Sequence, residues 1–116
     1  MQRLKGKKQI EELFVSGSSI SVFPLRLVYL KTKTENRVGV SVSKKNFKSA
    51  VDRNKIKRRL RVGVDNHFKN LEKEIKDRFL FMILYTGKEM PESRALNARF
   101  ETVLNRFKKN INDLKK

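Results

Sequence analysis

The segment RVGVSVSKKNFKSAVDRNKIKRRLR, residues 37–61, changes from a strand pattern to a helix pattern within a few positions. Valines alternate with small or polar residues up to Ser43, which predicts a strand with one apolar and one polar face. From Ala50 to beyond Leu71, apolar residues recur every four positions, which predicts a helix with Ser49 as its N-cap. A strand followed directly by a basic helix is therefore the centre of the predicted fold.

Four further elements are predicted around this unit. A short helix at 8–15 and a strand at 24–30 precede it, separated by an SGSS turn. We expect the strand at 24–30 to pair with the strand at 37–43 as a hairpin. The run FLFMILY, residues 79–85, is apolar at odd and even positions, which predicts a strand in the sheet interior. Apolar residues at 3 and 4 spacings over 96–114 predict a long amphipathic helix.

The predicted order of elements is helix, strand, strand, helix, strand, helix. This order is typical of an α+β fold, here a small α/β sandwich with helices on a sheet. At 116 residues, we expect one domain spanning 1–116, with eight Phe to build its core.

The composition excludes several classes of protein. The chain has no Cys, which excludes disulfide frameworks, thiolate zinc sites and cysteine nucleophiles. Its longest apolar run is seven residues, whereas a membrane helix needs about 20. The N-terminus lacks the pattern of a secretory signal. We therefore expect a cytoplasmic protein without a membrane partner.

Positive charge dominates the chain and is concentrated in one segment. Lys and Arg number 29 against 12 Asp and Glu, for a net charge of +17. Residues 44–61 contain nine cations opposed only by Asp52. Like charges one helical turn apart cost a few tenths of a kcal/mol per pair, so a phosphate-rich partner would offset a real cost. A solvated basic face without a role is the alternative.

A second contact with nucleic acid is suggested by apolar and aromatic residues near cations. Ile10 and Phe14 on the first helix, with Tyr29 on a strand, lie close in sequence to basic residues. Unpaired bases stack on aromatic rings beside cationic side chains in many single-strand binders. The same spacing of Phe14 and Tyr29 is also typical of core residues, and the sequence leaves both interpretations open.

Residues typical of catalysis are scarce. His67 is the only histidine and lies on the apolar side of its predicted helix, where a packing role is the usual one. No second His or Cys can complete a metal cage, and the carboxylates alternate with lysines as solvated partners do. We therefore predict a binding protein with no catalytic and no metal-ligating residues of its own.

The stretch SVSKK and the following helix resemble the protein subunit of bacterial ribonuclease P. That family carries a helix opening A-V-x-R-N-[RK]-x-K-R-x-x-R, and the resemblance extends to RLK at 3–5 and to RVGVSVSKK. The residues that match the helix motif are Ala50, Val51, Arg53, Asn54, Lys55, Lys57, Arg58 and Arg61.

The resemblance implies a fold and a function. The fold would be related to the second domain of ribosomal protein S5, with a left-handed crossover. The function would be to bind the large catalytic RNA of the enzyme and the 5′ leader of precursor tRNA. The RNA would perform the Mg²⁺-dependent hydrolysis and hold Mg²⁺, and no protein partner would be required.

The resemblance also implies two sets of site residues. The set that would bind the RNA subunit is Lys44, Lys45, Lys48, Arg53, Asn54, Lys55, Lys57, Arg58 and Arg61. The set expected near the leader, in a cleft between the first helix and the sheet, is Ile10, Phe14, Tyr29 and Arg37. Ile10 stands where many relatives have a Phe.

Three alternatives remain open from the sequence. The basic helix could bind ribosomal RNA in a ribosomal protein, or another structured RNA without a processing role. It could enter the major groove of duplex DNA. A nuclease that works without RNA is the third alternative, which the scarcity of catalytic residues opposes.

Overall fold

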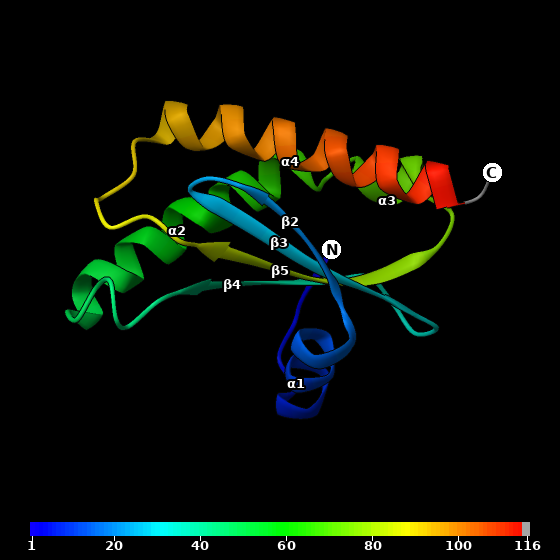
Figure 1. The fold of residues 1–116 in the computed structure, drawn as a ribbon, viewed down its shortest axis with the longest axis horizontal. Helices are drawn as coiled ribbons and strands as arrows, with labels where there is room; N and C mark the ends of the chain where they lie inside the picture. The colour runs from blue at the N-terminus through cyan, green and yellow to red at the C-terminus, as the bar shows by residue number, and fades with distance from the viewer. Residues whose placement is uncertain (115–116) are drawn as a thin grey trace.

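A computed structural model of the chain describes residues 1–114, with side chains through 112, and centres on one five-stranded sheet (Figure 1). The strand order across the sheet is β1-β4-β5-β3-β2. The strands are β1 (Gln2–Arg3), β2 (Ser18–Val22), β3 (Leu25–Thr32), β4 (Arg37–Val42) and β5 (Arg78–Tyr85). β4 is parallel to β1 and β5, whereas β3 is antiparallel to β2 and β5.

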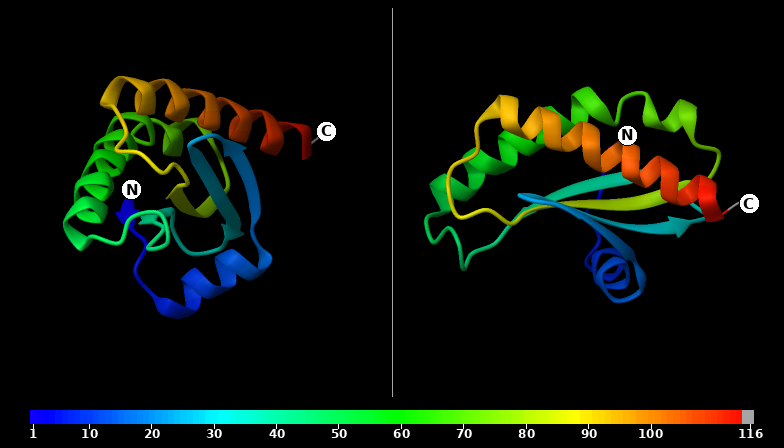
Figure 2. Two further views of the ribbon diagram at one scale, coloured as in Figure 1. Left: turned by 60° about the vertical axis from the view of Figure 1, so that its left-hand side comes forward. Right: turned by 45° about the horizontal axis from the view of Figure 1, so that its top comes forward.

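Helices cover the two faces of the sheet unequally. α1 (Lys7–Ser16) lies alone against one face, and α2 (Ala50–His67), α3 (Leu71–Glu74) and α4 (Ser93–Leu114) lie on the other (Figure 2). The predicted α+β class is confirmed, and the six predicted elements occur in the expected order. The structure adds β1, β2 and α3, which the sequence did not predict. None of the helices in the described residues combines the length and apolar character needed to cross a bilayer.

The central position of β5 follows from its sequence. Phe81 and Ile83 are fully buried on one face, while Leu80 and Met82 are buried on the other. A strand that is apolar on both faces is stable only between two layers, as the sequence predicted. β5 therefore lies between β3 and β4, and the predicted hairpin of those two strands is wrong.

Two other boundaries differ from the sequence prediction. Ser18 and Ser19, which were expected in the SGSS turn, belong to β2, because Ile20 and Val22 of the same strand point into the core. The middle helix does not run beyond Leu71 but ends at His67. The break is followed by α3, and both Leu71 and Ile75 enter the core there.

Two apolar cores hold these layers together. The larger lies between the sheet and the helices α2 and α4, and the smaller lies beneath α1. The apolar stripe predicted for α4 faces the larger core; the side chain of Leu114 lies outside the described residues. The buried residues of the α4 stripe are Leu96, Phe100, Val103, Leu104, Phe107 and Ile111.

Candidate nucleic-acid interface

The orientation of α2 decides which of its cations face outward. Ile56 and Leu60 are fully buried against the sheet, and the Ser49 hydroxyl caps the helix by accepting from the Asp52 N–H at 3.4 Å. The opposite side of the helix and the turn before it are therefore exposed. The predicted residues exposed there are Lys44, Lys45, Lys48, Asn54, Lys55 and Arg58, and those half-buried are Arg53, Lys57 and Arg61.

The cations of residues 44–61 form none of the ion pairs found in the described part of the chain. Those ion pairs are Met1 N-terminus to Glu72, Lys31 to Asp77, Arg37 to Glu35 and Lys108 to Glu74. The mutual repulsion of the basic side chains is therefore not offset by protein carboxylates at salt-bridge distance. An external polyanion would lower this repulsion.

Two arginines of α2 also hold the fold together, which the sequence did not indicate. Arg53 Nη1 donates to the carbonyl oxygens of Phe47 at 2.8 Å and of Lys48 at 2.9 Å. Arg59 donates to the carbonyl oxygen of Pro91, in the loop before α4. These two guanidinium groups tie the basic helix to its neighbouring loops.

A hollow connects the basic helix with the first helix. Arg61 from α2, Arg3 from β1 and Ile10 from α1 line it, together with Gly39 and Met82 of the sheet. Cationic and apolar surfaces are therefore contiguous, as a groove for a single strand requires.

The structure corrects the placement of Tyr29. Side chains alternate along β3, so Val28 faces α1 while Tyr29 faces α4. The Tyr29 ring is 9% exposed and contacts Phe107 edge to face at a centroid distance of 4.9 Å. Tyr29 is a core residue and does not line the cleft between the first helix and the sheet.

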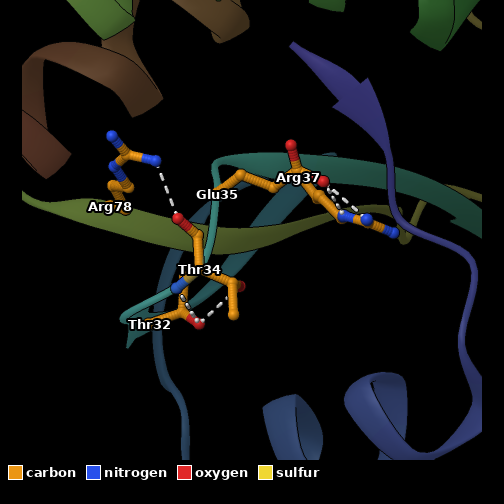
Figure 3. A network of polar contacts seen from close by, with 5 residues as sticks. All are labelled: Thr32, Thr34, Glu35, Arg37 and Arg78. Carbon is orange, nitrogen blue, oxygen red and sulfur yellow. Dashed lines mark hydrogen bonds and ion pairs between the residues drawn. The ribbon is translucent and has the colours of Figure 1, made fainter.

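The other residues expected near the leader differ in accessibility. Ile10 is half-buried and Phe14 is 48% exposed, so both can meet a ligand. Arg37 begins β4, and its Nε donates to Glu35 Oε1 at 3.0 Å (Figure 3). A phosphate at Arg37 must therefore compete with Glu35.

His67 packs as the sequence indicated. Its ring stacks on Phe100 with centroids 5.5 Å apart, and its Nε2 lies 2.8 Å from Asn97 Oδ1. Within the described residues, no three His, Cys, Asp or Glu side chains come together in a group that could hold a metal ion. The groups that gather along α2 and the hollow beside α1 are instead cations and apolar side chains.

The fold and this surface define a small α+β protein that presents a basic helix beside an apolar groove, a surface suited to nucleic acid. The chain belongs to the ribonuclease P family, whose model, described as "Ribonuclease P", matches residues 1–109. It is 32% identical over 120 residues to the "Ribonuclease P protein component" of Porphyromonas gingivalis, covering 95% of this chain and 85% of that one.

Solved structures of ribonuclease P proteins share the fold. The protein from Staphylococcus aureus superposes with a TM-score of 0.73 at 24% identity, covering 90% of this chain and 94% of that chain. The protein from Thermotoga maritima gives a TM-score of 0.74 at 20% identity, covering 91% and 97%. Family and relatives together assign this chain a role in processing the 5′ end of tRNA.

Proposed function

We propose that residues 1–116 act as one RNA-binding domain that docks on a catalytic RNA and helps it remove the 5′ leader of precursor tRNA. The observation that supports this proposal most strongly is the cation cluster of residues 44–61. It has no carboxylate at salt-bridge distance in the described chain, and it opens into the hollow beside Ile10. Such a surface suits one structured RNA and one single strand.

The chemical step is proposed to belong to the RNA. Phosphodiester hydrolysis by metal ions needs closely placed oxygen ligands, which folded RNA can supply through its phosphates. Within the described residues, no three His, Cys, Asp or Glu side chains come together as a set of metal ligands. Mg²⁺ would be held mainly by the RNA subunit, and the protein would take no part in bond cleavage.

The protein would increase the affinity of the catalytic RNA for precursor tRNA. Catalytic RNA and precursor tRNA are both polyanions, and the cations of the turn at 44–48 and of α2 would reduce the repulsion between them. Ile10 and Phe14 would contact the leader, with Arg37 near its phosphates. Both RNAs are partners in this scheme, with no protein partner and a cytoplasmic location.

Reconstitution tests this proposal. The purified chain is added to its cognate catalytic RNA, and cleavage of precursor tRNA is followed over a Mg²⁺ series. We expect the protein to lower the Mg²⁺ requirement and to strengthen binding of substrate with a leader more than binding of mature tRNA. Equal binding of the two substrates, with an unchanged Mg²⁺ requirement, would refute the proposal.

A further inference from the structure

One aromatic side chain is exposed at an end of the sheet, away from α1. Phe23, at the tip of the β2–β3 hairpin, is 71% exposed. Apart from Phe14, all other aromatic rings of the chain are buried. A ring with this exposure contributes little to the core and is available to a ligand.

The strand register brings this tip close to the basic turn. Tyr85 at the end of β5 pairs with Val42 of β4 on one side and with Leu25 of β3 on the other. With about 4.8 Å between neighbouring strands, Leu25 lies roughly 10 Å from Val42. The hairpin tip, the turn after β4 and the loop after β5 therefore leave the same end of the sheet (Figure 1).

Hydrogen bonds fix these three segments relative to one another. The Thr86 N–H and hydroxyl both donate to the Pro24 carbonyl oxygen, at 2.8 and 3.0 Å. The Asn46 side-chain amide donates to the Gly87 carbonyl oxygen at 3.3 Å. The position of Phe23, next to Pro24, is thus tied through the loop after β5 to the turn that contains Asn46.

The loop after β5 is itself well anchored. The Tyr85 hydroxyl donates to the Glu89 carbonyl oxygen at 2.5 Å. Burial, and secondarily the negative charge of Glu89, raise the pKa of Tyr85, so this donor stays protonated at neutral pH. Lys88 on this loop is exposed, as are Lys44 and Lys45 on the turn.

From these observations we propose a binding site for an unpaired nucleotide at this end of the sheet. The Phe23 ring stacks on a base of single-stranded RNA, and Lys44, Lys45 and Lys88 hold the flanking phosphates. A stacking ring beside cations is the combination that binds single strands without strong sequence preference. This inference rests on the proposed RNA-binding function and adds a contact outside α2 and the α1 hollow.

Tryptophan fluorescence can test the site directly, because the chain contains no Trp. In Phe23→Trp the single indole reports on stacking, and in Asn110→Trp it stands at an exposed position of α4, on the face of the sheet opposite α1. We expect hexa-adenylate to quench the first variant and not the second, and a short RNA duplex to quench neither. Equal quenching of both variants by hexa-adenylate, or no quenching of Phe23→Trp, would overturn the inference. It would also be overturned if hexaglutamate quenched Phe23→Trp as strongly as hexa-adenylate does.

Removal of the ring provides the second measurement. Phe23→Ala should weaken hexa-adenylate binding about fivefold or more, from the loss of one stacked base, while Asn110→Ala on α4 leaves it unchanged. An unchanged affinity of Phe23→Ala would refute this site even if the unmodified chain binds its catalytic RNA. If the unmodified chain fails to bind that RNA, the proposed function itself fails.

Discussion

Arg53 Nη1 lies 2.8 Å from the carbonyl oxygen of Phe47, so one cation of the basic helix holds the turn that precedes it. The same nitrogen donates to the Lys48 carbonyl oxygen. Arg53 is half-buried, whereas Arg58 on the same helix is exposed and makes no ion pair within the described chain. The basic cluster therefore contains positioning residues as well as residues free to meet phosphate.

This division predicts different effects at the two positions. Arg58→Ala should weaken binding to the catalytic RNA and flatten its log-log salt dependence by roughly 0.7 to 0.9, the share of one phosphate contact. Arg53→Ala should also weaken binding, but it should in addition speed amide exchange over residues 44–48. Hydrogen exchange of both variants checks this, and an unchanged exchange rate in Arg53→Ala would contradict a positioning role.

Neighbouring arginines supply a charge-matched comparison. Arg59 is tied to the Pro91 carbonyl oxygen, so Arg59→Ala should cost about 1 kcal/mol of unfolding free energy. Arg58→Ala removes the same charge without losing a described hydrogen bond and should leave stability within about 0.5 kcal/mol. Urea unfolding of the two variants measures the difference, and equal stabilities would argue against the Arg59 tether.

The leader groove predicts different outcomes for two changes that involve an aromatic ring. Ile10→Phe adds a ring to the hollow beside α1 and should tighten binding of leader-bearing tRNA several-fold through base stacking. Tyr29→Phe keeps the core ring beneath α4 and should leave leader affinity unchanged. Binding assays with and without the leader separate the two. A loss of leader affinity in Tyr29→Phe would show that the hydroxyl reaches the RNA after all.

Close packing of α2 on α4 predicts an unusual effect at Gly63. A Cβ atom on residue 63 would lie 2.3 Å from Cε2 of Phe100, closer than real contacts allow. Gly→Ala within a helix normally gains about 1 kcal/mol, but here overpacking should turn this into a net loss of about 1 to 3 kcal/mol. Asn66→Ala is the control, since it raises helix propensity at an exposed position of the same helix without overpacking. A rise in the urea midpoint of Gly63→Ala would contradict the packing.

The sequence predicted those elements whose pattern is local. The Ser49 cap, the doubly apolar β5 and the stripe of α4 all follow from periodicity within one segment. Strand pairing did not, because it depends on competition between strands far apart: β5, almost 50 residues after β3, displaces β4 from the expected hairpin. Both faces of β3 are apolar, so alternation alone could not assign Tyr29 to either one.

The candidate site was predictable to a similar extent. The density of cations over 44–61 is visible in the sequence, and the structure exposes most of them. The second role of Arg53 and Arg59 was not visible, because their partners are backbone carbonyl groups that carry no residue-specific signal. Phe23 was likewise missed, since its exposure depends on the β2–β3 pairing that the serine-rich segment concealed.

The central claim is that the position of the cations, and not net charge alone, binds the catalytic RNA. Two triple variants of equal charge separate these effects. One replaces Lys44, Arg58 and Arg61 by Gln, and the other replaces three exposed cations of α4, Arg94, Arg99 and Lys109, by Gln. The measurement is the affinity of each variant for the catalytic RNA over a salt series. We expect the first variant to bind at least about tenfold more weakly than the second, with a salt slope lower by roughly two. Equal affinities and equal slopes would contradict the claim.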